Sequence, residues 1–421
     1  MAGPSGSRSA LVLIQLGSAG AALIAWLALS VLVPAEPQQE AVAALSIGTV
    51  VGLVLSLGVP VILPNLLRGV DLSLGIRGTA GAVPLIIVGL LSAVACVLGS
   101  AAFIAGLGGP APLAAGYGGA LASGQAAAQL ARVRYDLLTM AVSVLPVVMF
   151  PVSWLAVLSA DLAPLSSRVV VGVCLVACLA SSQWRVLRSR GTAGARVGRS
   201  QWAWLGQAIP LVPHMIFFSA LLQGPRLVAS FSADAELLIA VHIPMLVLNG
   251  CFTALAAFNA VWTVTVQMSD DADLHHRWTS LCTQMLVAGA GLAVLAGVTI
   301  VVLLKLEFVE PVGSGMIVLA ALAPFVLSLY YAGAAVVVRD GQRSVTFPAA
   351  SGLGLGTMVV ISLMAPAQPW LQLGVALSVT MAVMLGSVRG TRAVPVLPLT
   401  ALAIGAVFIT AATGALALVS R

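Results

Sequence analysis

The chain has 421 residues, of which 60% are hydrophobic and only 8% are charged. A soluble protein carries about 25% charged residues, so this composition excludes a set of water-soluble domains and indicates a protein solvated by lipid. Alternating apolar strands of about ten residues are absent, which excludes an outer-membrane barrel, and we attribute the net charge of +6 to membrane topology rather than to nucleic-acid binding.

Stretches of about 20 apolar residues, enough to cross a hydrocarbon core, recur along the chain. The first follows a short basic start at Arg8 and is too long for the apolar region of a signal peptide. We therefore predict thirteen membrane-spanning helices, at 10–33, 41–66, 79–106, 110–131, 137–160, 167–184, 202–223, 236–262, 279–304, 312–337, 345–365, 369–388 and 395–420.

The nineteen basic residues fall mainly on one side of these predicted helices. With a cytoplasmic N-terminus, fifteen of them lie on the cytoplasmic side, and four lie on the other side, namely Arg168, Arg226, Lys305 and Arg421. Cytoplasmic loops of membrane proteins carry an excess of Lys and Arg. The sequence therefore predicts a multi-pass protein of the cell (cytoplasmic) membrane, with its N-terminus in the cytoplasm.

The longest cytoplasmic connection, from Arg185 to Ser200, carries five arginines. Six predicted helices precede it, so the two halves enter the membrane in the same orientation, as parallel repeats do. We expect an all-α polytopic membrane protein with two six-helix bundles and about one extra C-terminal helix. The predicted segments are an N-terminal bundle at 1–184, a basic linker at 185–201, a C-terminal bundle at 202–388 and an additional helix at 389–421.

All thirteen acidic residues lie in the predicted loops or at helix ends. A proton antiporter or an intramembrane aspartyl protease normally needs a carboxylate within the membrane, so neither class is favoured. The chain has one lysine, Lys305, and no Gly-rich phosphate loop, which excludes an ATPase of its own. We expect no enzyme, no catalytic residue and no cofactor.

Metal binding is also disfavoured. The five cysteines lie inside apolar runs, without the spacing of a disulfide framework or a metal site. The turn from Asp270 to His276 has three acids and two histidines and is compatible with a divalent cation. A solvated cytoplasmic loop is the favoured interpretation of that turn, so we predict no metal.

Uncharged or cationic polar side chains recur at helical spacing in three of the predicted helices. Each stripe can hydrogen-bond a neighbouring helix, but three stripes together can line a hydrated cavity between the bundles. The stripes are Gln125, Gln129 and Arg132 on the fourth helix, Gln207 and His214 on the seventh, and His242, Asn249 and Thr253 on the eighth.

Two of these helices carry a recognisable pattern. The run from Ile209 to His214, the run Gln223-Gly224-Pro225-Arg226 and the run from Phe258 to Trp262 resemble polysaccharide flippases of the multidrug/oligosaccharidyl-lipid/polysaccharide exporter superfamily. Pro225 stands where those flippases commonly have Asp before the arginine. The segments from Leu45 to Arg68 and from Gln129 to Asp136 are similar to the second and fourth helices of that family.

The resemblance implies a MATE-like fold and the translocation of a polyprenyl-diphosphate-linked oligosaccharide by alternating access, for cell-surface polysaccharide assembly. A diphosphate-sugar head group crosses about 30 Å of hydrocarbon only if polar groups replace its hydration. Cationic and neutral groups suit such an anion. The candidate substrate-binding residues are Arg226, His214, Arg68, Gln207, His242 and Asn249.

The partners that this function implies are the lipid-linked glycan, membrane lipids, and a polysaccharide polymerase or glycosyltransferases, but no nucleic acid. Three other functions stay open at this point. One is a drug or cation antiporter of the flippases' own superfamily, which the missing intramembrane acid disfavours. The turn from Gly69 to Arg77 is similar to a loop of the major-facilitator superfamily, which favours a small-solute carrier. The basic linker is also compatible with a non-transporting membrane scaffold for glycan-assembly enzymes.

Overall fold

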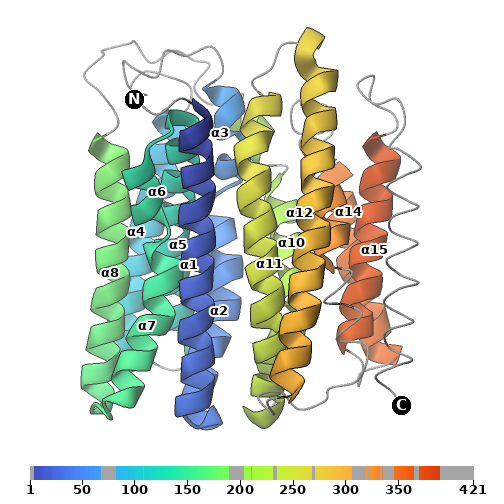
Figure 1. The fold of residues 1–421 in the computed structure, drawn as a ribbon. Coiled ribbons are helices and arrows are strands. Elements are labelled where there is room, and N and C mark those ends of the chain that lie inside the picture. Colours follow the sequence, from blue (N-terminus) through green and yellow to red (C-terminus); the bar gives the residue numbers. More distant parts are fainter. Residues whose placement is uncertain are drawn as a thin grey trace. The chain divides into compact units, whose positions relative to one another are not determined.

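A computed structural model gives the fold (Figure 1) and describes residues 4–67, 82–107, 109–188, 203–209, 211–230, 235–267, 271–305, 319, 323–331, 334, 346–364 and 369–388. Within these residues every regular element is a helix. The helices are α1 (Pro4–Leu32), α2 (Ala35–Leu55), α3 (Val59–Leu66), α4 (Ala82–Ile104), α5 (Pro110–Arg134), α6 (Leu137–Ser143), α7 (Leu145–Ser159), α8 (Pro164–Arg188), α9 (Ala203–Ala208), α10 (Leu211–Ser230), α11 (Ala235–Gln267), α12 (Asp271–Lys305), α14 (Thr346–Met364) and α15 (Pro369–Val388).

The protein is a multi-pass membrane protein. In the described residues, six helical stretches are long and apolar enough to cross a membrane, and the pair α6 and α7, bent by 40°, forms a seventh. The six are Ser9–Leu32, Gln38–Leu55, Val83–Ile104, Pro164–Arg188, Val241–Ala260 and His276–Lys305. The predicted helix at 395–420 lies outside the described residues, so the expected total of thirteen stays a prediction.

Three of the predicted spans are broken helices. The span 41–66 divides between α2 and α3 at Leu57 and Gly58, which have positive φ angles of 51° and 71°. The span 137–160 divides between α6 and α7 just before Pro146, which has no N–H to donate to the preceding turn. The span 202–223 divides between α9 and α10. These breaks interrupt backbone hydrogen bonds inside apolar segments, so neighbouring groups must satisfy them.

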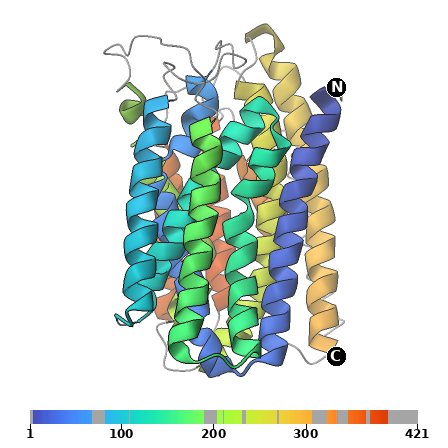
Figure 2. The same ribbon diagram turned by 90° about the vertical axis from the view of Figure 1, so that its left-hand side faces the viewer.

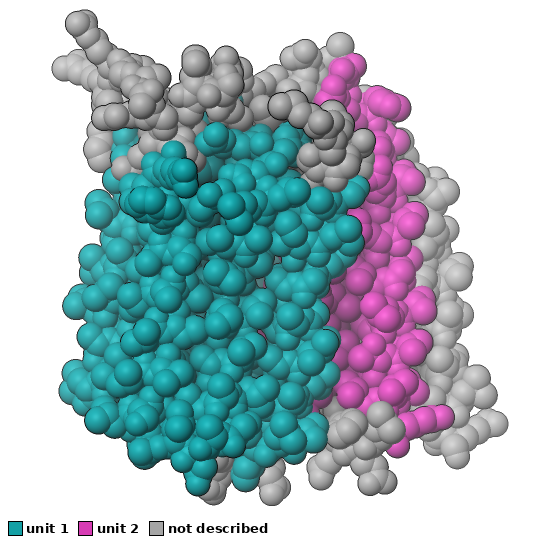
Figure 3. All heavy atoms as spheres, turned by 60° about the vertical axis from the view of Figure 1, so that its left-hand side comes forward, with its two compact units in different colours: residues 1–219 teal, residues 220–421 magenta. Residues whose placement is uncertain are grey.

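The chain forms two compact units, which we describe separately (Figure 3). Unit 1 is Met1–Ser219 and unit 2 is Ala220–Arg421, so the division lies within α10. The expected all-α architecture of two helical bundles is confirmed. The residue limits predicted for the bundles, the linker and the extra helix stay predictions, because 189–202 and 389–421 lie outside the described residues.

In unit 1, α5 packs against α2, α4, α6 and α8. Glycines allow this close approach: a Cβ at Gly119 would lie 2.5 Å from the Ser92 carbonyl oxygen, and a Cβ at Gly99 would lie 2.6 Å from that of Pro112. Small residues at helix interfaces replace the hydrophobic driving force that lipid removes. The buried small-residue face of α5 therefore organises the unit.

The end of unit 1 at which α1 begins also holds α3 and α6 (Figures 1 and 2). There Leu11 of α1 packs with Ala128, Ala131 and Met140, from α5 and α6. The break between α2 and α3 meets the C-terminal end of α9, because a Cβ at Gly58 would lie 2.8 Å from the Ala208 carbonyl oxygen. Two of the broken spans of unit 1 thus touch at their breaks.

Unit 2 contains most of α10 together with α11, α12, α14 and α15. α11 packs against α12, and α14 packs against α15. Gly354 of α14 lies against Leu221 of α10 and Thr380 of α15, so these three helices meet at one point. This packing holds the C-terminal part of α10 inside the unit.

Candidate functional site

Arg226 is the most buried of the arginine and lysine residues in the described part of unit 2. It lies on α10 with 1% of its surface exposed. Gly224 precedes it and leaves room for Met358 of α14, whose sulfur would lie 2.7 Å from a Cβ at that position. Pro225 lies inside the helix and removes one backbone donor. The long cationic side chain of Arg226 is therefore buried next to a glycine and a proline, where α10 packs closely against α14.

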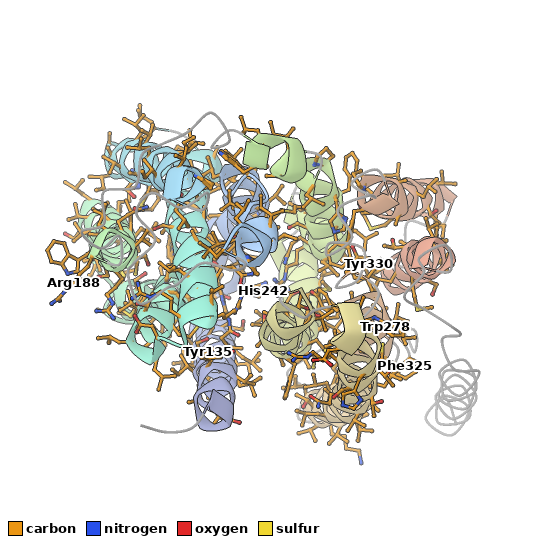
Figure 4. All side chains as sticks on the ribbon, turned by 90° about the horizontal axis from the view of Figure 1, so that it is seen from above. Tyr135, Arg188, His242, Trp278, Phe325 and Tyr330 are labelled. Carbon is orange, nitrogen blue, oxygen red and sulfur yellow. The ribbon has the colours of Figure 1, made fainter. Side chains whose placement is uncertain are left out.

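The guanidinium of Arg226 donates to neutral acceptors on two helices. Its Nη1 donates to Gln223 Oε1 at 3.3 Å, and its Nη2 donates to the backbone carbonyl of His242 on α11, also at 3.3 Å. His242 is fully buried. The contact ties the C-terminal part of α10 to α11 at His242, which Figure 4 labels, and it places a positive charge beside the backbone of a buried histidine.

Of the other predicted site residues, the structure describes the side chains of His214 and Asn249. His214 is half-buried on α10 with its ring centroid 5.5 Å from that of Phe218, and it precedes Arg226 by twelve residues in the sequence. Asn249 is half-buried on α11, two turns after His242. Gln207 belongs to α9, but its side chain lies outside the described residues, as does all of Arg68.

The structure therefore brings Arg226 and His242 together and adds one residue that was not predicted. Gln223 is a direct hydrogen-bond partner of Arg226, and the sequence signal for it was its position three residues earlier on the same helix. The contact with His242 joins residues sixteen apart on separate helices, which no spacing rule within one helix anticipates.

Arg185 of unit 1 contacts a carboxylate, unlike Arg226, which contacts neutral acceptors. Asp136 caps the N-terminus of α6 by accepting a hydrogen bond from the Thr139 backbone N–H at 3.0 Å. Arg185 of α8 lies 3.3 Å from the same carboxylate. Burial raises the pKa of Asp136, but hydrogen bonds from Thr139 and the charges of Arg185 and Arg134 outweigh it, and the pKa lies below its usual value. This ion pair fixes the turn between α5 and α6.

Metal binding finds no support in the described residues, where no group of three His, Cys, Asp or Glu side chains is arranged to hold an ion. The turn from Asp270 to His276 is only partly covered by this statement, because Asp270 and the side chains of Asp271 and His275 lie outside the described residues. Asp273 of that turn pairs with Arg277 at 3.2 Å on an exposed helix face.

Comparisons with known proteins identify the fold. No protein-family model matches the chain, and no curated protein matches it. Among solved structures it is similar to the eukaryotic MATE transporter AtDTX14, with 15% identity, a TM-score of 0.64 and coverage of 92% of this chain and 96% of that one. The chain has the MATE transporter fold.

Two further structures agree over nearly the whole length. One is the MATE multidrug transporter DinF-BH in complex with R6G, with 14% identity, a TM-score of 0.61 and coverage of 93% and 96%. The other is a MOP superfamily transporter from Pyrococcus furiosus, with 11% identity, a TM-score of 0.55 and coverage of 97% and 96%. The solved proteins that share this fold are transporters rather than enzymes, in agreement with the sequence-based expectation.

Proposed function

We propose that the chain is an alternating-access flippase that moves a polyprenyl-diphosphate-linked oligosaccharide across the cell membrane, for cell-surface polysaccharide assembly. In this proposal the N-terminus of the chain lies in the cytoplasm. The observation that carries the proposal is the guanidinium of Arg226, 1% exposed in unit 2 beside His242. Ionisable groups within a membrane are costly to keep, so an arginine there marks a substrate path by default.

The chemistry of the proposed site suits an anionic, hydroxylated head group. Arg226 presents a planar set of donors that match phosphate oxygens, and amide and imidazole groups exchange hydrogen bonds with sugar hydroxyls. We assign the charge contact to Arg226 and Arg68, and the polar contacts to His214, Gln207, His242 and Asn249. The lipid tail stays in the bilayer, where its transfer costs nothing.

The competing function within the same fold is export of organic cations, because DinF-BH is a multidrug transporter. A buried arginine repels a cationic substrate at short range. The transporter from Pyrococcus furiosus provides a precedent, within one superfamily, for a binding pocket of reversed polarity that suggests a different function.

The test is translocation of a fluorescent, short-chain polyprenyl-diphosphate-N-acetylglucosamine in vesicles that contain the full chain. We expect the wild type to move it, and Arg226→Ala to lose about tenfold or more of the rate, because a hydrogen bond to a charged group contributes about 1.5–3 kcal/mol. Arg277→Ala is the matched control, since it removes one arginine from an exposed face of the same unit.

Two outcomes would contradict the proposal. One is a wild-type chain that moves no lipid-linked sugar but exports a cationic dye, which would favour the multidrug class. The other is Arg226→Ala that supports glycan export in cells at normal protein levels. A chain that moves neither substrate but binds a polysaccharide polymerase or glycosyltransferase would favour the scaffold function.

A further inference from the structure

One face of α5 in unit 1 carries polar atoms that have no partner. Gln125, Gln129 and Arg132 lie four and three residues apart, so they share one face of the helix. Within the described structure, Gln125 Oε1, Gln129 Oε1 and Arg132 Nε are buried and form no hydrogen bond. We call these three side chains the α5 polar face.

Single buried polar atoms without a partner also occur elsewhere in the described part of unit 1, at Gln15 Oε1 and Gln38 Oε1, but other side chains are fully engaged. Gln183 of α8 is also half-buried, and its Nε2 donates to the Gly89 carbonyl at 3.2 Å and to Ser123 Oγ at 3.0 Å. Ser123 belongs to α5 itself, on the side of the helix away from Gln125. What distinguishes the α5 polar face is that three such side chains, one of them a cation, lie along one face of a single helix.

A buried polar group without a hydrogen-bond partner destabilises the folded protein, and a charged one does so more strongly. Three such groups on adjacent turns are a substantial cost for a helix whose remaining buried residues are mostly alanine and glycine. A helix interface alone would be more stable with apolar side chains at these positions. The cost is accounted for if a ligand supplies the missing partners.

We propose that the α5 polar face is a binding subsite for a glycosyl phosphate head group, which deepens the function proposed above and rests on it. Sugar hydroxyls donate to the two amide oxygens, and a phosphate oxygen accepts from the Arg132 guanidinium. The face extends about 10 Å along α5, from seven residues at 1.5 Å each, which suits a head group better than a single ion.

The position of the subsite gives it a role. Arg132 lies in the last turn of α5, at the end that carries Arg134 and the turn to α6. In the predicted orientation this is the cytoplasmic end, so the α5 polar face receives a head group that arrives from the cytoplasm. The three side chains all belong to unit 1.

Binding by the full chain in detergent micelles tests the subsite, with short-chain polyprenyl-diphosphate-N-acetylglucosamine as the probe. We expect Arg132→Gln to weaken binding about tenfold or more. Arg188→Gln is the matched control, because Arg188 is an exposed arginine in the last turn of α8, at the edge of unit 1 (Figure 4). It should change binding less than twofold, and equal effects of the two variants would overturn the subsite.

Thermal stability without the probe separates binding from a structural role. Gln125→Leu removes an amide oxygen that has no partner, so we expect an unchanged or higher melting temperature together with weaker probe binding. Gln183→Leu breaks two hydrogen bonds and should lower the melting temperature. A Gln125→Leu variant that loses stability as Gln183→Leu does would show that Gln125 is structural, and it would overturn the proposal.

Competition identifies the source of the phosphate. We expect free uridine-diphosphate-N-acetylglucosamine to compete weakly with the probe and phosphatidylglycerol to compete even less. Equal competition by phosphatidylglycerol would make the face a site for ordinary lipid and overturn the subsite. A wild type that does not bind the probe would overturn the flippase function itself, whereas binding that Arg226→Gln weakens and Arg132→Gln leaves unchanged would overturn the subsite alone.

Discussion

Two arginines at the same end of unit 1 have opposite surroundings. Arg185 at the end of α8 meets the carboxylate of Asp136 at 3.3 Å, and its Nε donates to Thr139 Oγ1 at 3.1 Å. Arg132 at the end of α5 has no ion pair in the described residues, and its Nε is buried without an acceptor. Arg185 therefore stabilises the turn between α5 and α6, whereas the guanidinium of Arg132 has no such structural partner in the described residues.

The contrast between Arg185 and Arg132 gives a criterion for distinguishing structural from functional arginines in a chain with few acidic residues. An arginine whose donors are occupied by a carboxylate and a hydroxyl has little left for a ligand. An arginine that stays buried without such partners adds a cost that folding alone does not justify. Changes that make one arginine resemble the other test this contrast directly.

The largest effect is expected from Gln129→Glu, which gives Arg132 a carboxylate three residues away on its own face. The new ion pair should occupy the guanidinium, so head-group binding falls about tenfold to a hundredfold while thermal stability is kept or raised. Probe binding and melting temperature of the full chain measure the two effects. Unchanged binding would mean that Arg132 does not contact the phosphate.

Asp136→Ala should have the next largest effect, and on stability rather than on binding. The variant removes the cap of α6 and the partner of Arg185, at a cost of about 1 kcal/mol or somewhat more. Asp136→Asn keeps a capping oxygen and should lose less, which separates the cap from the ion pair. Both losses are read from thermal unfolding in detergent, and an equal loss in the two variants would assign the whole effect to charge.

The pH dependence of the Asp136 pair follows from the lowered pKa of its carboxyl group. A carboxyl with a lower pKa in the folded protein than in the unfolded chain stabilises the fold above the unfolded value of about 3.9, and this contribution is lost as the pH falls through the folded value. The stability difference between wild type and Asp136→Asn should therefore be constant above about pH 5 and shrink below about pH 4. A difference that does not change down to pH 3 would contradict the ion pair.

Arg277→Ala in unit 2 should have the smallest effect. Its pair with Asp273 is an i,i+4 contact in which the two side chains are 41% and 64% exposed. Exposed pairs of this kind contribute about 0.3–0.5 kcal/mol at low salt and less at high salt. The melting temperature should barely change, and a large loss would show that exposure is a poor guide to the value of an ion pair in this protein.

The sequence predicted the class of fold well and the site only in part. Composition and basic-residue bias are properties of the whole chain, and they led to two helical bundles in a membrane. The broken spans were harder, because the break at Leu57 depends on a positive φ angle at a leucine rather than on a proline. The partner of Arg185 lies 49 residues earlier, so only the packed structure reveals which arginine has an acid beside it.

The glycine contacts of α5 bear on how unit 1 can change shape. At Gly119 and Gly99 the backbones of α4 and α5 approach too closely for even a methyl group, so one helix cannot slide past the other without separation. We therefore expect rearrangement within the unit at the interrupted helices, at Leu57–Gly58, between α6 and α7, and between α9 and α10. Because Gly58 lies against the Ala208 carbonyl, we expect bending at one of these two interruptions to displace the other.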